Sequence, residues 1–323
     1  MLSIAPMMGL TDRHERFFLR LITRHALLYT EMITANALIY GDVSRLLQHD
    51  PREQPVSLQI GGSDPELLSQ SALIAEKYGY TEINLNIGCP SDRVQMGKFG
   101  ACLMAEPGLV AECVAAMSSV VSMEVTVKTR IGIDHHDDYE FLQAFVEKVS
   151  KSGCQTFIIH ARKALLNGLS PKQNREIPPL NYEVVRRLKA DFPELKIILN
   201  GGIKSLEQAS LQLDGVDGVM IGRAAYENPY MLVEADRLFY GKNALVKSRR
   251  EIFESYLHYV EEQLLAGVAL SRMTRHVLGL YQGCRGAGAY RRYLSEHCFQ
   301  PGVGIDTLYT ALSRVEDSPG NSA

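Results

Sequence analysis

Tryptophan is absent from this 323-residue sequence, and so is any long apolar run. No stretch reaches the roughly 18 consecutive apolar residues that a membrane-spanning helix needs, so we expect no membrane contact. The first residues carry neither a basic segment nor a cleavage site, which disfavours secretion and predicts a cytoplasmic protein. No CxxC pair occurs among the six cysteines, which are Cys89, Cys102, Cys113, Cys154, Cys284 and Cys298. This scatter favours free thiols over disulfides or a zinc site, and we expect no metal.

A strong charge of either sign is missing too. The chain has 34 lysines and arginines against 37 acids, and its net charge of −3 by itself disfavours a nucleic-acid partner. The cations are nevertheless clustered, because residues 161–175 and residues 270–295 contain no acid. These two basic clusters comprise Arg162, Lys163, Lys172 and Arg175, and Arg272, Arg275, Arg285, Arg291 and Arg292. They fit either a polyanion or ordinary solvated helix faces, and their counts favour neither.

Eight short runs rich in β-branched residues occupy the first two thirds of the chain. They lie at residues 3–5, 28–30, 56–60, 82–85, 125–129, 156–159, 196–199 and 218–221. Helical patterns follow them, so strands recur at intervals of about 20 to 45 residues, which predicts an α/β fold, the (β/α)8 TIM barrel. A doubly wound sheet is disfavoured because no GxGxxG loop follows the first strand.

The pattern changes after residue 240. We expect the barrel to occupy residues 1–240, a linker residues 241–248, and a small all-helical domain residues 249–323. One apolar helix face is formed by Ile252, Phe253, Tyr256, Leu257, Val260 and Leu264. Further helices are predicted at residues 270–282, 289–298 and 305–315, and residues 316–323 are expected to fray.

Polar groups gather where the predicted strands end, which is where this fold places function. Asn200-Gly201-Gly202 and Gly222-Arg223 follow the last two strands, so they predict a phosphate site built from bare amides and a guanidinium. Ordinary strand–helix turns are the alternative for these glycines. Lys128 ends an apolar strand and needs an anionic partner, such as the N1–C2=O edge of a reduced flavin.

Three further strand ends suit a flat heterocycle. Gln59 offers a donor and an acceptor side by side, which matches the imide edge of a flavin or a pyrimidine. Pro6-Met7-Met8 offers amides and a soft apolar surface for the ring. His160 is suited to donate to the ring system or to the phosphate, although a single histidine at a strand end is more often structural.

Cys89 lies in the turn Gly88-Cys89-Pro90 directly after the fourth strand. An ordinary thiol is largely protonated at neutral pH, so this side chain suits general acid catalysis. A buried structural cysteine is the alternative, and we favour it for the other five. The glycine-containing segment 91–101 is predicted to be a mobile loop over the barrel mouth.

The motifs occur in the order typical of one enzyme family. They are Ala5-Pro6-Met7-Met8-Gly9, Gln59-Ile60-Gly61-Gly62, Asn84-Leu85-Asn86-Ile87-Gly88-Cys89-Pro90, Val127-Lys128-Thr129-Arg130, Ile159-His160-Ala161-Arg162, Asn200-Gly201-Gly202 and Met220-Ile221-Gly222-Arg223. Together they resemble the tRNA-dihydrouridine synthases. Residues 168–180, 276–280 and 291–296 are similar to the A subfamily.

The resemblance implies a reaction and a cofactor. It implies that FMN, recharged by NADPH, passes hydride from N5 to C6 of a D-loop uridine, with Cys89 as proton donor to C5. The uridines would be those at positions 20 and 20a of tRNA. FMN would be held by Pro6, Met7, Met8, Gln59, Lys128, His160, Asn200, Gly201, Gly202, Gly222 and Arg223. The base would contact Asn86.

The two basic clusters are then candidates for binding the tRNA backbone. We expect contacts from Lys172 and Arg175, from Arg291 and Arg292, and from Arg93 beside the thiol. Two alternatives stay open: an FMN barrel oxidoreductase acting on a small molecule such as dihydroorotate, and a non-catalytic RNA-binding protein. A basic helical domain argues against the first, and Cys89 with Lys128 argues against the second.

Overall fold

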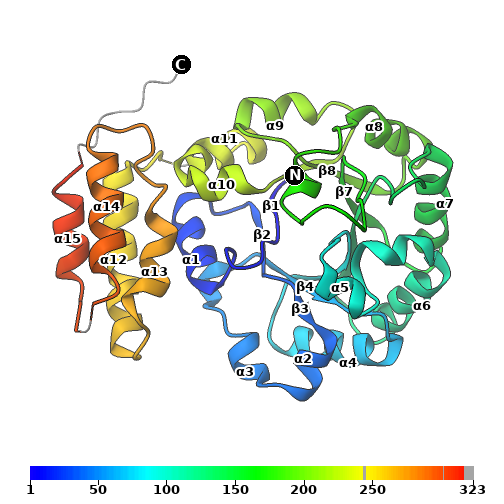
Figure 1. Ribbon diagram of the computed structural model, residues 1–323, viewed down its shortest axis with the longest axis horizontal. Helices are drawn as coiled ribbons and strands as arrows, with labels where there is room; N and C mark the ends of the chain where they lie inside the picture. Colours follow the sequence, from blue (N-terminus) through cyan, green and yellow to red (C-terminus); the bar gives the residue numbers. More distant parts are fainter. Residues whose placement is uncertain (243–244, 301, 316–323) are drawn as a thin grey trace.

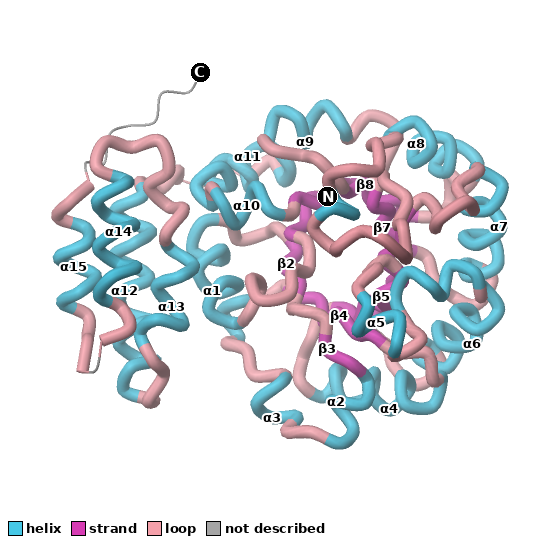
Figure 2. The backbone as a smooth tube through the Cα atoms, viewed as in Figure 1, coloured by secondary structure: helices cyan, strands magenta, loops and turns pink. Residues whose placement is uncertain are grey.

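A computed structural model describes residues 1–242, 245–300 and 302–315. Eight parallel strands form a closed barrel in the centre, and helices surround it (Figure 1; Figure 2). The strands are β1 Leu2–Ile4, β2 Leu27–Tyr29, β4 Val56–Gly61, β5 Glu82–Ile87, β6 Glu124–Arg130, β7 Thr156–His160, β8 Lys196–Asn200 and β9 Gly218–Ile221. The pairing of β2 with β4 closes the ring, and the short β3 Ile33–Thr34 lies beside β4. The predicted TIM barrel is confirmed.

The surrounding helices begin at residues that cap a helix well. Asp12, Asp64 and Asp138 each accept hydrogen bonds from backbone amides of the first turn that follows. The helices of the barrel region are α1 Arg13–Ile22, α2 Ala35–Tyr40, α3 Val43–Leu46, α4 Pro65–Lys77, α5 Asp92–Met96, α6 Pro107–Ser118, α7 Tyr139–Ser150, α8 Tyr182–Asp191, α9 Leu206–Gln212, α10 Arg223–Glu227 and α11 Ala235–Tyr240. In the described part of the chain, no helix combines the length and apolarity needed to cross a membrane.

Four further helices stand together beside α1 (Figure 1). They are α12 Arg249–Leu265, α13 Leu270–Val277, α14 Ala287–His297 and α15 Asp306–Leu312. Aromatic packing joins them to the barrel, since the ring of Phe17 on α1 stacks on Tyr259 of α12 with centroids 3.9 Å apart. The expected fraying of residues 316–323 lies outside the described residues.

Helix α13 ends earlier than predicted. A helix was expected over residues 270–282, but the helix ends at Val277 and tight turns follow. At Gly279 the backbone approaches α10 so closely that a Cβ would lie 2.4 Å from the carbonyl oxygen of Glu227. The close approach to the barrel therefore prevails over the helical pattern of the sequence.

The interior of the barrel is divided into an apolar and a polar part. Inward side chains of β1, β2, β7, β8 and β9 form a small apolar cluster of Ala5, Leu27, Tyr29, Ile158, Ile198 and Met220. Inward positions on β4, β5 and β6 are polar instead: Gln59, Glu82, Asn84, Asn86 and Thr126, all buried. Because side chains alternate along a strand, Glu82, Asn84 and Asn86 lie on the same inner face. Barrels are usually filled with branched apolar residues, so this polar half is unusual.

Candidate active site

Cys89 lies on the turn that follows β5, at the mouth of the barrel. The backbone amides of Gly88 and Cys89 both donate to Oδ1 of Asn86, at 3.1 and 3.0 Å. Cys89 is partly exposed, and its Sγ is 3.5 Å from Oγ of Ser91. The turn is therefore fixed by a side chain of the preceding strand, while the residue stays partly exposed.

The segment after Cys89 contains a helix. Residues 91–101 were predicted to be a loop, and this is wrong for part of the segment, because α5 forms within it. Nε2 of Gln95 on α5 donates to the carbonyl oxygens of Pro90 and Leu166, at 2.9 and 2.6 Å. This side chain ties α5 to the loop between β7 and α8, and the sequence analysis did not identify it.

Lys128 extends from β6 toward the mouth. Its Nζ donates to Oδ1 of Asn200 at 3.0 Å, and in the described part of the chain it forms no ion pair with a carboxylate. Desolvation and the neighbouring Arg130 lower the pKa of Lys128 to about 7. An anion bound here would restore its charge, so the geometry agrees with the predicted need for an anionic partner.

Arg130 is a second buried cation at the mouth, and the sequence analysis assigned it no role. Its guanidinium donates to the carbonyl oxygens of Gly88, Lys163 and Asn174, at 2.8, 3.2 and 3.1 Å. Burial lowers the pKa of Arg130 to about 10, and only 4% of the residue is exposed. The only signal in the sequence was its place in the Lys128-Thr129-Arg130 triplet at the end of the strand.

His160 and Arg162 leave buried nitrogens without partners. Nδ1 of His160 and Nε of Arg162 are inaccessible to solvent, and neither has a hydrogen-bond partner among the residues that the structure describes. Burial and the surrounding arginine and lysine charges hold the pKa of His160 well below its usual value. Neutral histidine is therefore the expected form, and these nitrogens suit a ligand with acceptor atoms.

The two positions directly after β8 require glycine. Gly201 and Gly202 have φ angles of +118° and +72°, and a Cβ on Gly202 would lie 2.4 Å from the side chain of Leu180. Arg223, at the start of α10, forms an ion pair of 2.6 Å with Glu176. The predicted role of this guanidinium in a phosphate site stays a prediction, and an incoming anion would share the guanidinium with the carboxylate of Glu176.

Gln59 is buried and engaged within the protein. Its Nε2 donates to Oδ1 of Asn84 at 2.8 Å, and its Oε1 accepts from Nδ2 of Asn86 at 2.9 Å. Each end of the carboxamide retains capacity for one more hydrogen bond. Pro6 and Met7 are partly exposed at the mouth, and 66% of Met8 is exposed.

The residues predicted to touch tRNA divide into two groups. Lys172 and Arg175 are exposed on the loop between β7 and α8, and the charge of Arg175 contributes to lowering the pKa of Arg130 and His160. Arg93 is exposed on α5 near the thiol. Arg291 and Arg292 are exposed on α14, in the group of C-terminal helices and apart from the mouth (Figure 1).

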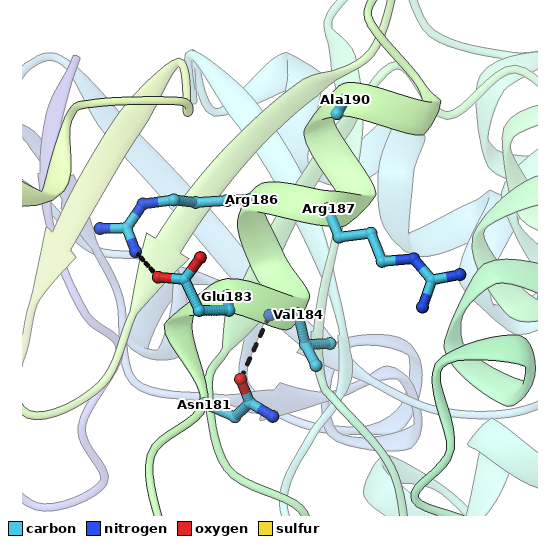
Figure 3. Close-up of a pocket in the computed structure, with 6 residues that line it drawn as sticks. All are labelled: Asn181, Glu183, Val184, Arg186, Arg187 and Ala190. Atoms are coloured by element: carbon cyan, nitrogen blue, oxygen red, sulfur yellow. Dashed lines mark hydrogen bonds and ion pairs between the residues drawn. The ribbon is translucent and has the colours of Figure 1, made fainter.

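A shallow hollow on α8 lies on the outside of the barrel and offers no reactive group (Figure 3). Its acid, Glu183, pairs with Arg186 at 2.5 Å, and Asn181 caps the helix by accepting from the amide of Val184. Within the described residues, no group of three or more histidine, cysteine and acidic side chains is arranged to hold a metal ion. The mouth of the barrel is the candidate active site.

Comparisons with known proteins agree with this geometry. The model of the family "Dihydrouridine synthase (Dus)" matches residues 3–316. A protein from Synechocystis named "tRNA-dihydrouridine(20/20a) synthase" is 58% identical over 99% of this chain and 95% of its own length. Proteins of the same name from Vibrio parahaemolyticus and Escherichia coli are 56% and 55% identical, over 97% and 98% of this chain and 96% and 95% of their own lengths. This chain is a member of the dihydrouridine synthase family.

Proposed function

We propose that this protein reduces uridine to 5,6-dihydrouridine in tRNA, with FMN as its flavin and NADPH as the reductant. The names of its relatives support positions 20 and 20a as the sites of modification. One observation carries the proposal: the partly exposed Cys89 shares the barrel mouth with Lys128, a cation that pairs with no carboxylate among the described residues. We place the reaction in the cytoplasm.

The residues at the mouth fit a flavin mononucleotide. Lys128, whose pKa falls to about 7 in the protein alone, suits the anionic edge of a reduced flavin. The unpartnered Nδ1 of His160 and the amides of Gly201 and Gly202 suit the acceptor atoms of a ring carbonyl or a phosphate. The full set would be Pro6, Met7, Met8, Gln59, Lys128, His160, Asn200, Gly201, Gly202, Gly222 and Arg223. When bound, the flavin supplies the hydride that C6 of the uridine accepts.

Cys89 supplies the proton for C5 of the uridine. Asn86 accepts from the amides of Gly88 and Cys89, and Arg130 donates to the carbonyl oxygen of Gly88. Together these two side chains fix the turn. A base can reach this depth only if it is turned out of its stack in the folded tRNA. We propose that Asn86 contacts that base and that Arg93 contacts a carbonyl or a phosphate beside it.

Affinity for the RNA backbone comes from the exposed cations. We propose contacts from Lys172 and Arg175 at the mouth and from Arg291 and Arg292 on α14. In this proposal residues 249–323 form a helical tRNA-binding domain, joined through residues 241–248 to a catalytic barrel of residues 1–240. Residues 243–244, 301 and 316–323 lie outside the described part of that division.

The test is a direct assay of the product. Unmodified tRNA is incubated with the purified protein and NADPH, digested, and analysed by mass spectrometry for a gain of two hydrogens at positions 20 and 20a. We expect turnover with tRNA and none with free uridine or dihydroorotate. Turnover of dihydroorotate without any product in tRNA would replace this proposal with a small-molecule oxidoreductase.

A further inference from the structure

A chain of hydrogen bonds runs through the polar half of the barrel and ends at the turn of Cys89. The amide of Cys89 donates to Asn86 at 3.0 Å, Asn86 to Gln59 at 2.9 Å, and Gln59 to Asn84 at 2.8 Å. Asn84 then donates to Oγ1 of Thr126 at 2.8 Å. The hydroxyl of Thr126 donates to Oε1 of Glu82 at 3.2 Å.

All links of this chain point the same way. A backbone N–H can only donate, so Asn86 must present its oxygen to the turn and its nitrogen to Gln59. At the far end, Glu82 is 6% exposed and accepts from both Thr126 and Tyr29, the latter at 2.6 Å. With a donor fixed at one end and an acceptor at the other, the carboxamides have one consistent orientation.

We propose that Glu82, Thr126 and Asn84 are positioning residues that fix the orientation of Asn86 and, through it, the turn that carries Cys89. The inference rests on the proposed role of Cys89 as proton donor. None of the three lies at the mouth, and none is needed there to touch substrate or cofactor. Their role is to decide which end of each carboxamide faces the active site.

The physical reason is that a carboxamide has nearly the same shape in its two orientations. If the link at Thr126 is broken, Asn84 loses the partner that fixes its orientation, and the carboxamides above it are then held only from the side of the Cys89 turn. A reversed Asn86 would direct its nitrogen at the amides of Gly88 and Cys89, where donor would face donor. Consecutive hydrogen bonds also polarise one another, so one broken link weakens the rest of the chain. Displacing a reacting group by about 1 Å can cost up to about a hundredfold in rate.

Thr126 allows an experiment in which packing and hydrogen bonding predict opposite results. Thr126→Val keeps the shape and removes the hydroxyl, whereas Thr126→Ser keeps the hydroxyl and removes a methyl group. We expect Thr126→Val to slow uridine reduction at saturating tRNA by about tenfold or more, and Thr126→Ser to stay within about twofold of the parent. KM for tRNA should not change in either variant, because the affinity for tRNA comes from the exposed cations.

Two additional variants complete the test. Tyr29→Phe removes a hydrogen bond to the same carboxylate but no link of the chain, so it should lower the melting temperature and leave the rate intact. If Thr126→Val does not fold, Glu82→Gln takes its place, because it conserves volume and replaces the carboxyl group at the end of the chain with a carboxamide whose nitrogen can face Thr126. We expect Glu82→Gln to slow the same step by about threefold or more.

The outcomes separate this inference from the proposed function. An inactive parent protein would contradict the proposed function itself. An active parent with an unimpaired Thr126→Val and an impaired Thr126→Ser would overturn the positioning role and leave only packing. A uniform loss in all variants, with the loss matching their melting temperatures, would overturn it as well.

Discussion

Buried charges at the barrel mouth and at the junction with the C-terminal helices are treated in opposite ways. At the junction, His276 of α13 lies 3.0 Å from a carboxylate oxygen of Asp12 and 3.1 Å from one of Glu15. At the mouth, Lys128 and Arg130 have carbonyl and amide partners but, within residues 1–242, 245–300 and 302–315, no carboxylate partner. The charge of His276 at the junction is balanced by carboxylates of the protein, whereas the charges of Lys128 and Arg130 at the mouth are not.

This difference separates stability from function. A buried ion pair is strongly destabilised when one partner is removed, so the junction residues serve the fold. A cation that the protein leaves without a counter-ion lowers stability until an external anion binds, and such residues concentrate at functional sites. Changes at the mouth should therefore affect chemistry and ligands, and changes at the junction should affect unfolding.

The largest effect is expected at Cys89. Cys89→Ala removes the proton donor and should slow dihydrouridine formation by about a hundredfold or more. Flavin absorbance, tRNA affinity and melting temperature should remain those of the parent, because the hydrogen bond of the thiol, to Oγ of Ser91, is long at 3.5 Å. Mass spectrometry of the product measures the rate of dihydrouridine formation, and calorimetric unfolding measures the melting temperature. Undiminished activity would remove Cys89 from the mechanism.

The next largest effect is expected at Lys128. Lys128→Met should weaken flavin binding by about tenfold to a hundredfold, as expected for the loss of a charge-assisted hydrogen bond. The flavin-free protein should become more stable, because a lysine whose pKa falls to about 7 disfavours the folded state at every pH below its unfolded value. Fluorescence titration with FMN and thermal unfolding of the flavin-free protein test this pair of results. Weaker FMN binding together with lower stability of the flavin-free variant would contradict the idea that Lys128 serves the ligand at the expense of the fold.

The sequence predicted these two regions unequally. The eight strands were found to within about two residues because β-branched runs and polar strand ends are local features. The paired cluster has no local signature, since Asp12 and His276 come together only when α13 packs on α1. Arg130 was seen only as part of a motif, because its three carbonyl partners belong to loops whose course the sequence does not determine. The contact of Gln59 with Asn84 has no local signature either, because it depends on the pairing of β4 with β5.

At the junction, the expected effect is a pH-dependent stability. The carboxylates of Asp12 and Glu15 raise the pKa of His276 to about 9 against the opposing effect of burial. The contribution of His276 to the free energy of unfolding is therefore complete below its unfolded pKa of about 6.5, and it is lost as the pH rises through about 9. Burial raises the pKa of Glu15 too, which acts in the same sense, so we expect the free energy of unfolding to fall by about 1 to 3 kcal/mol between pH 6 and pH 10.

Urea unfolding across this pH range measures the effect. His276→Gln should lower the free energy of unfolding at pH 6 and flatten its dependence on pH. The matched control is His258→Gln, because His258 is exposed on α12 and should leave the profile unchanged. An unaltered slope in His276→Gln would show that the cluster does not titrate with folding.

The smallest effect is expected from exposed cations, which belong to neither group. Arg291→Ala combined with Arg292→Ala should weaken tRNA binding by about tenfold and reduce the slope of log affinity against log salt by about one to two. Melting temperature should not change, since both side chains are exposed on α14. Lys77→Ala combined with Lys148→Ala is the control, because these exposed lysines lie on the outer helices α4 and α7. Equal slopes in the two double variants would remove Arg291 and Arg292 from the tRNA interface.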